Sequence, residues 1–172
     1  LDLPLFRYVC KAVKAGQSIE TNFADPDVLF VTNTYRKVRC ERLRMMQFVR
    51  FQKTADGTYF AMIEPDYDVL PLIVPHFSDR FSEECWLIYD RCRRYGYYHA
   101  GHKSVRVTFE DGAEVFRLPD GRLSEAMRDE DEMWYQEMWR TYFKAICIKE
   151  RLNPRKHRKD MPVRYWKYLT EK

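Results

Sequence analysis

The sequence predicts an α+β fold, with an antiparallel sheet that is built from hairpins and flanked by N-terminal and C-terminal helices. Apolar residues recur every three or four positions near both ends of the 172-residue chain, which is the spacing of amphipathic helices. Between these segments, short apolar and aromatic runs are separated by Asp-Gly turns at 56–57 and 111–112, which are typical of hairpins.

Two helices are expected in the first part of the chain, over residues 3–14 and from residue 26 to about residue 47. The first should end at Gly16, because glycine is a common helix terminator. The second should begin with Asp25 as its N-cap and Pro26 in its first turn.

The middle of the chain is expected to form strand pairs. We predict pairs at 48–53 and 58–63, at 85–90 and 95–99, and at 105–109 and 113–118, followed by a turn at 119–121. A helix made irregular by Pro71 and Pro75 is expected over residues 68–81.

The last part of the chain is expected to be helical again. The acidic run 129–132 should begin a long helix with an apolar stripe from Tyr135 to Ile146, since carboxylates stabilise helix N-termini. The helix should end near Asn153, because Pro154 disfavours helical geometry in the residue before it. A basic link then leads to a short helix over 163–169.

Length and composition fit a single domain spanning residues 1–172. We expect it to be the C-terminal part of a longer protein, because the chain does not begin with Met. No run approaches the roughly 20 apolar residues of a membrane span, and the N-terminus does not match a signal peptide. The five cysteines are odd in number and irregularly spaced, so we expect reduced thiols in a cytoplasmic protein.

Charge is concentrated at the C-terminal end. Residues 149–172 hold nine Lys and Arg against three Asp and Glu, a local net charge of +6, whereas residues 1–148 sum to −2. A basic segment on a near-neutral body is the pattern expected for contact with a polyanion. The alternative is a solvated helical face. We expect residues 153–172 to form a basic segment packed on the domain.

Several residues of this segment are candidates for binding nucleic acid, since Lys and Arg bind phosphates and Tyr and Trp stack on unpaired bases. Two arginines of the second helix and the following strand, which should point outward, complete the set. The candidates are Arg44, Arg50, Arg155, Lys156, Arg158, Lys159, Arg164, Tyr165 and Lys167. Two alternatives remain: Tyr165, Trp166 and Leu169 pack the last helix onto the body, and a buried carboxylate holds Arg42 or Arg44 in an ion pair.

Catalysis has only weak candidates in Glu64, His76 and Asp90. Two carboxylates and a histidine can transfer protons if they converge, but each lies at the predicted end of an element, where capping and turn formation are the usual roles. The chain has no zinc-type cysteine spacing, phosphate-binding loop or nucleophile motif. We therefore expect no metal and no cofactor.

Several short segments together resemble an uncharacterised bacterial family described as DNA-metabolism proteins. These segments are Phe48-Val49-Arg50-Phe51, Ile63-Glu64-Pro65-Asp66, Val69-Leu70-Pro71-Leu72, Trp86-Leu87-Ile88-Tyr89-Asp90 and Met161-Pro162-x-Arg164-Tyr165-Trp166-Lys167. The resemblance covers nearly the whole chain and is weakest between residues 100 and 128. It implies a radical-SAM partner protein of DNA modification or repair, or fusion to a uracil-DNA-glycosylase-like domain. It supplies no catalytic residues.

Taken together, the residues and the resemblance predict a nucleic-acid-binding accessory module in DNA modification or repair that acts with a partner enzyme and is not an enzyme on its own. One alternative is a protein-interaction subunit without DNA binding of its own. Another is a catalyst on DNA that uses Glu64, His76 or Asp90.

Overall fold

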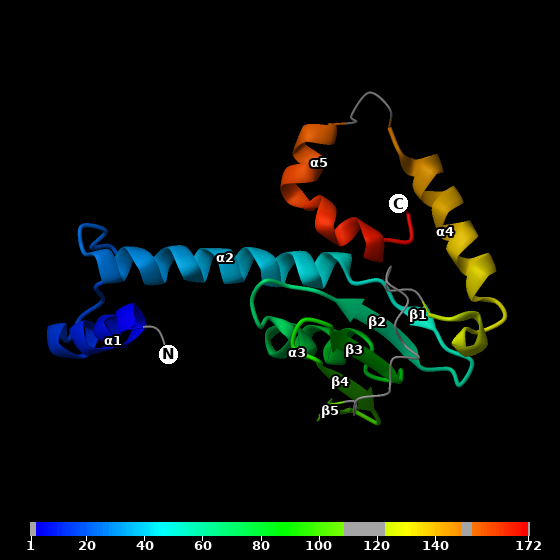
Figure 1. Cartoon of the computed structure of the whole chain (residues 1–172), viewed down its shortest axis with the longest axis horizontal. Coiled ribbons are helices and arrows are strands. Elements are labelled where there is room, and N and C mark those ends of the chain that lie inside the picture. The colour runs from blue at the N-terminus through cyan, green and yellow to red at the C-terminus, as the bar shows by residue number, and fades with distance from the viewer. Residues whose placement is uncertain (1–2, 109–122, 149–152, 172) are drawn as a thin grey trace. The chain divides into compact units, whose positions relative to one another are not determined.

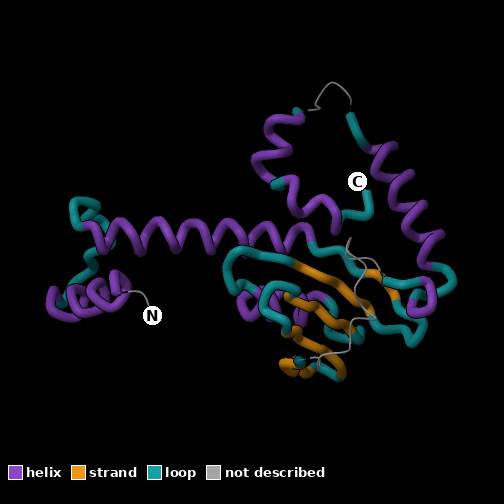
Figure 2. Tube along the Cα trace, in the orientation of Figure 1, coloured by secondary structure: helices purple, strands orange, loops and turns teal. Residues whose placement is uncertain are grey.

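A computed structural model describes residues 3–108, 123–148 and 153–171 (Figure 1). The chain divides into two compact units, Leu1–Glu41 and Arg42–Lys172, and each is described by itself. Helices occur toward both ends of the chain and a five-stranded, mostly antiparallel sheet lies between them in the sequence (Figure 2). The predicted α+β class is therefore confirmed.

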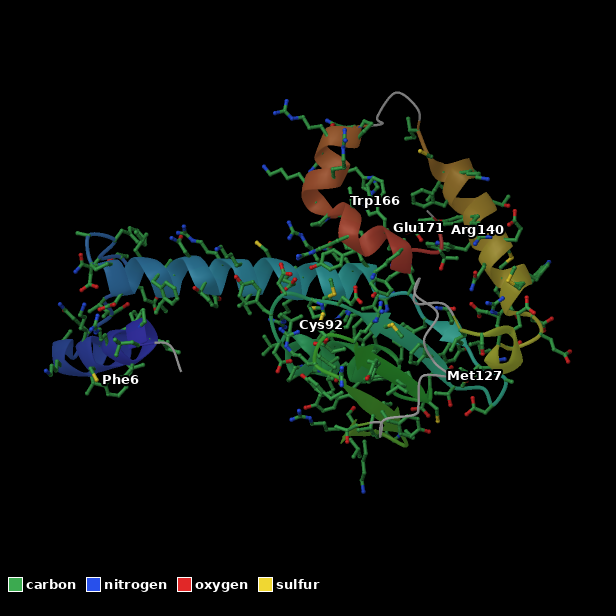
Figure 3. The ribbon with its side chains drawn as sticks, in the orientation of Figure 1. Phe6, Cys92, Met127, Arg140, Trp166 and Glu171 are labelled. Atoms are coloured by element: carbon green, nitrogen blue, oxygen red, sulfur yellow. The ribbon has the colours of Figure 1, made fainter. Side chains whose placement is uncertain are left out.

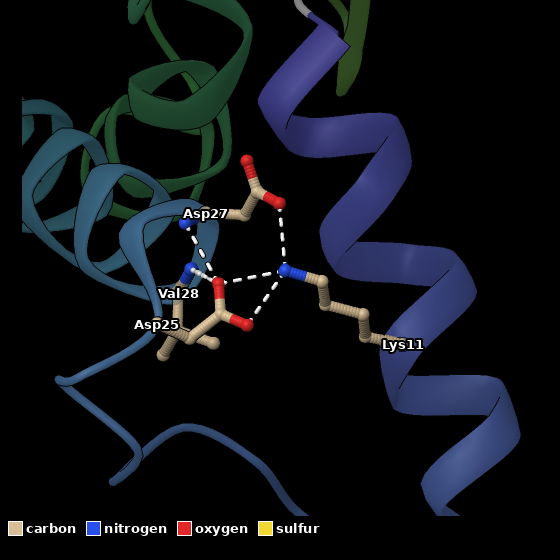
Figure 4. Close-up of polar contacts among 4 residues, drawn as sticks. All are labelled: Lys11, Asp25, Asp27 and Val28. Atoms are coloured by element: carbon tan, nitrogen blue, oxygen red, sulfur yellow. Dashed lines mark hydrogen bonds and ion pairs between the residues drawn. The ribbon is translucent and has the colours of Figure 1, made fainter.

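The first unit contains helix α1 (Leu3–Ala15) and the first part of helix α2 (Pro26–Phe48). The Asp25 carboxylate accepts hydrogen bonds from the backbone amides of Asp27 (2.9 Å) and Val28 (3.4 Å), so it caps α2 as the sequence predicts (Figure 4). Lys11 of α1 pairs with both Asp25 (2.6 Å) and Asp27 (2.8 Å). The Lys11 ammonium group lowers the pKa of Asp25 below its usual value.

The apolar face of α1 has no cover within the first unit. Leu5, Phe6, Val9 and Val13 are all exposed, and α1 contains no buried residue. Its helical spacing was predicted correctly.

The second unit is built on a sheet with strand order β1-β2-β3-β4-β5. Its strands are β1 (Gln52–Lys53), β2 (Tyr59–Ile63), β3 (Trp86–Asp90), β4 (Tyr95–Ala100) and β5 (Lys103–Val107). Strands β1 and β2, β3 and β4, and β4 and β5 form antiparallel pairs, as expected of hairpins. Strands β2 and β3 are parallel, because helix α3 (Leu70–Arg80) returns the chain to the edge from which β2 began.

Both faces of the sheet carry apolar side chains. On one face, Phe77 of α3 contacts Trp86 of β3, and the Trp86 ring stacks on the buried His99 of β4. The residues that alternate with these form a second cluster on the other face. That cluster comprises Phe60, Met62, Leu87, Tyr89 and Leu123, with Val107 and Tyr168 packed against it.

Two predicted strands differ from the structure. The strand predicted at 48–53 is reduced to β1, because α2 continues to Phe48; Arg50 therefore does not lie on a strand. The strand predicted at 105–109 begins earlier, at residue 103, and pairs with β4. Its predicted partner at 113–118 and the turn at 119–121 lie outside the described residues.

The C-terminal helices also differ from the prediction. After a short 3-10 helix, η2 (Glu125–Met127), helix α4 spans Glu132–Ile146 and so ends earlier than expected. The predicted basic link contains a further helix, α5 (Pro154–Asp160). The last helix, η4 (Val163–Tyr168), is a 3-10 helix. None of the helices in the described ranges is both long enough and apolar enough to cross a membrane.

Candidate functional site

Helix α5 carries four of the nine residues predicted to bind nucleic acid. Asn153 caps its N-terminus, accepting a hydrogen bond from the Lys156 amide at 2.9 Å, and Pro154 occupies its first turn. Arg155, Arg158 and Lys159 are exposed. Lys156 instead forms an ion pair with Asp160, one helical turn away, at 2.8 Å.

Arg44 holds the other end of α5. Its Nε donates a hydrogen bond to the carbonyl of Asp160 (2.9 Å) and its Nη2 to the carbonyl of Lys159 (3.1 Å). These carbonyls lie at a helix C-terminus, where they lack partners within the helix and where a cation is favoured. The guanidinium group of Arg44 therefore stabilises α5.

The remaining predicted cations are paired with carboxylates far away in the sequence. Arg50 pairs with Glu171 at 2.8 Å, and Lys167 pairs with Glu64 at 2.6 Å. Arg164 pairs with Asp66. These contacts attach η4 and the end of the chain to the sheet and to the end of α2.

The aromatic residues of η4 take part in packing. Tyr165 and Leu169 are buried. Trp166 is half-buried, stacks on His157 at 5.4 Å between ring centroids, and donates a hydrogen bond from Nε1 to the carbonyl of Met161 (3.1 Å; Figure 3). This arrangement favours the packing interpretation for the last helix over base stacking.

The two candidate catalytic carboxylates lie at the ends of the parallel strands. Asp90 is the last residue of β3 and is fully buried; it accepts hydrogen bonds from Nη1 (2.8 Å) and the backbone amide (3.1 Å) of Arg93. Glu64 follows β2 and pairs with both Arg91 (2.9 Å) and Lys167 (2.6 Å). His76 lies on α3, where its ring contacts Phe77.

The electrostatics of Glu64 oppose a role in proton transfer. Burial raises the pKa of this carboxyl. The hydrogen bond from Lys167 and the positive charge of Arg91 act in the opposite direction, and with the other contacts they outweigh burial, so the pKa of Glu64 lies below its ordinary value. A general base works best when its pKa lies near the working pH. Both candidate carboxylates are held in ion pairs, Glu64 with Arg91 and Lys167 and Asp90 with Arg93. Within the described residues, no cluster of His, Cys, Asp and Glu could hold a metal ion.

A pocket that was not predicted lies between α4 and the first hairpin. Its volume is about 670 Å³, and it is lined by residues from the end of α2, from β1 and β2, from α4 and from the end of the chain. These residues are Gln47, Arg50, Phe51, Lys53, Tyr59, Glu132, Tyr135, Gln136, Trp139 and Thr170. The size and the aromatic lining with a few polar groups are typical of ligand pockets.

The wall that α4 contributes is tied to the end of the chain. Arg140 donates a hydrogen bond to the Thr170 carbonyl (2.9 Å), and Trp139 donates one to the Glu171 carboxylate (3.1 Å). Arg140 and Glu171 are labelled in Figure 3. The apolar stripe of α4 is largely exposed, whereas the buried residues of the helix are Glu132 and Gln136. Sequence periodicity could not find the pocket, since it marks Tyr135 and Trp139 as ordinary core positions.

Comparison with known proteins gives one match. A family model described as a domain of unknown function, DUF4130, matches residues 2–171. No curated protein and no solved structure matches the chain.

Proposed function

We propose that this chain, which belongs to the DUF4130 family of unknown function, is a nucleic-acid-binding accessory module in DNA modification or repair. The observation that carries the proposal is the exposed basic face of α5. The partner enzyme is a radical-SAM or uracil-DNA-glycosylase-like protein, as the resemblance of the sequence to DNA-metabolism proteins implies.

Three cations make up the basic face of α5: Arg155, Arg158 and Lys159. Residues three and four positions apart lie on the same side of a helix, so these side chains can reach one phosphate backbone together. No carboxylate in the described parts of the chain forms an ion pair with any of the three. Arg158 donates a hydrogen bond to the Pro154 carbonyl (3.3 Å), but none of the three has to break an ion pair with these carboxylates before it binds a phosphate and releases counterions.

The other predicted contact residues have a smaller part in this proposal. Four of them already form ion pairs with carboxylates: Arg50, Lys156, Arg164 and Lys167. Each would have to give up its carboxylate to bind a phosphate, so it would contribute less binding free energy than a cation without such a pair. Arg44 supports the interface indirectly, because it holds the C-terminal end of α5.

The test is fluorescence anisotropy with labelled single- and double-stranded DNA across a salt series. The variant Arg155→Ala/Arg158→Ala/Lys159→Ala should bind more weakly and with a shallower dependence of log K on log salt. Loss of three phosphate contacts should reduce the slope by about 2.7 on duplex and by about 2.1 on single strands.

A matched control removes the same charge elsewhere. The variant Arg7→Ala/Lys14→Ala/Lys103→Ala replaces three exposed cations of α1 and β5 and should keep the wild-type slope. Equal slopes for the α5 variant and the wild-type protein, or binding that does not respond to salt, would reject the proposal.

A second candidate function is a protein-interaction subunit without DNA binding of its own. A set of exposed side chains on α4 favours it, since aromatic residues and Met are enriched at the centre of protein interfaces. These side chains are Met133, Trp134, Met138, Tyr142 and Ile146, which are between 50% and 61% exposed. Co-purification with the partner enzyme, together with no DNA binding even at low salt, would establish this alternative instead.

A further inference from the structure

We propose that the pocket between α4 and the first hairpin binds an unpaired nucleobase that presents an amino group to Glu132. This inference rests on the proposed nucleic-acid binding and names the part of the ligand that the pocket recognises.

The walls offer flat aromatic surfaces. Tyr135 and Trp139 are four residues apart on α4 and therefore lie on one side of that helix, and Phe51 and Tyr59 line the same pocket. Tyr135 is 47% and Trp139 38% exposed. Because the Arg50 guanidinium lies over the Trp139 ring, Tyr135 offers the more open surface for contact. Every nucleobase has a π-face that can stack on such rings. The volume of about 670 Å³ can take a base together with its sugar.

The polar groups of the pocket are held in place before any ligand binds. Glu132 is 6% exposed and Gln136 is 9% exposed. One Glu132 oxygen accepts a hydrogen bond from the Lys53 backbone amide (2.9 Å), and the other accepts one from Nε2 of Gln136 (2.8 Å). A carboxylate oxygen has a second lone pair, so each can accept a further hydrogen bond from a ligand in a defined direction.

The charge of Glu132 indicates the chemistry of that ligand. Within the described parts of the chain, no Lys, Arg or His forms an ion pair with this buried carboxylate; the nearby Lys53 and Arg50 are paired with Asp129 and Glu171. The N-terminus of α4 stabilises the charge only in part. A buried carboxylate gains from further donors, and carboxylates recognise the amino group of cytosine in this way. We therefore expect cytosine and adenine to bind better than thymine, which has no amino group.

The experiment compares two exposed tyrosines. Tyr135 lines the pocket, whereas Tyr35 of α2, 62% exposed, is not among the residues that line it. Binding of labelled oligo-dC and oligo-dT is measured by anisotropy for the wild-type protein, Tyr135→Leu and Tyr35→Leu. The loss of base stacking in Tyr135→Leu should weaken binding of oligo-dC about 5-fold or more, and Tyr35→Leu should bind like the wild-type protein.

A second variant tests the polar group without emptying the pocket. Glu132→Gln has nearly the same shape and keeps an oxygen that can accept the hydrogen bond from the Lys53 amide. It should reduce the preference for oligo-dC over oligo-dT while retaining binding. Equal binding by Tyr135→Leu and Tyr35→Leu, or no preference for oligo-dC in the wild-type protein, would overturn the proposal.

A titration with the mononucleotide dCMP, followed by NMR, separates the two sources of the base and separates this inference from the proposed function. Tyr135-dependent binding of dCMP without binding of the strand supports a base pocket for free nucleotides and rejects nucleic-acid binding through α5. Strand binding that the α5 variant loses but Tyr135→Leu keeps supports the proposed function and overturns the pocket. Binding of neither ligand overturns both.

Discussion

Replacement of Arg93 by alanine should destabilise the second unit more than replacement of any exposed cation. Arg93 donates from Nη1 to Asp90 at 2.8 Å and to the Pro65 carbonyl at 3.1 Å, and from Nη2 to the Asp66 carbonyl at 2.7 Å. It therefore joins the end of β3 to the segment that follows β2. The variant removes the guanidinium and leaves the Asp90 carboxylate, which is 0% exposed, without its cation.

The magnitude follows from the burial of the pair. Removal of one partner of a buried ion pair costs about 3–5 kcal/mol, because the other charge is left uncompensated. The side chain of Arg93 is 27% exposed, so water can partly reach Asp90 once the arginine is gone. We expect a loss near the lower end, about 3 kcal/mol of the free energy of unfolding.

Urea denaturation, followed by circular dichroism, measures this loss without changing the ionic strength. With a slope of about 1–3 kcal/mol per molar urea, the midpoint should fall by roughly 1–3 M. Asp90→Asn on the Arg93→Ala background removes the stranded charge and should recover part of the loss. Lys103→Ala, an exposed control, should stay within about 0.5 kcal/mol of wild type. An equally small change in Arg93→Ala would refute the reasoning.

Two further perturbations test the packing of the sheet and the attachment of the chain end. Gly96→Ala would place a Cβ 2.7 Å from the Ile88 carbonyl oxygen in the neighbouring strand; because that carbonyl belongs to a paired backbone, we expect a loss of about 1–3 kcal/mol and a lower melting temperature by circular dichroism. An unchanged melting temperature of Gly96→Ala would contradict the prediction that this Cβ disturbs the packing of β3 and β4. For Glu171, burial raises the pKa, but the hydrogen bond and charge of Arg50 lower it more, so its folded pKa lies below the unfolded value of about 4.3. Its contribution to stability is therefore complete above that pH and is lost as the pH falls through the folded pKa. Glu171→Gln should cost stability in urea at pH 7 and much less at pH 3, and an equal cost at both would be inconsistent with this assignment.

Helix caps and tight turns could be predicted from the sequence, because they depend on residues that are adjacent in the chain. The start of α2 was predicted because Asp25 caps the helix from its own sequence neighbourhood. The Asp-Gly turn at 56–57 predicted the hairpin of β1 and β2 for the same reason. Helix α5 was missed although its signal is local: Asn153-Pro154 was interpreted as the end of one helix, whereas it is also the N-cap and first residue of the next.

The direction of β3 and the role of the basic residues depended on distant parts of the chain. Whether β3 would pair parallel or antiparallel to β2 is decided by the path of α3 between them. Arg50, Arg164 and Lys167 meet carboxylates 98 to 121 residues away, so their charges could be counted but their pairing could not be foreseen.

The sequence by itself determined the α+β class, most of the helices and strands, and the concentration of positive charge at the C-terminal end, because these follow from residue type and short-range spacing. Only the tertiary structure decided which cations of α5 form no ion pair with the carboxylates in the described ranges, and that Lys53, Glu132 and Tyr135 line one pocket. The physical reason is that ion pairs, burial and cavities depend on distances in space between residues that are far apart along the chain.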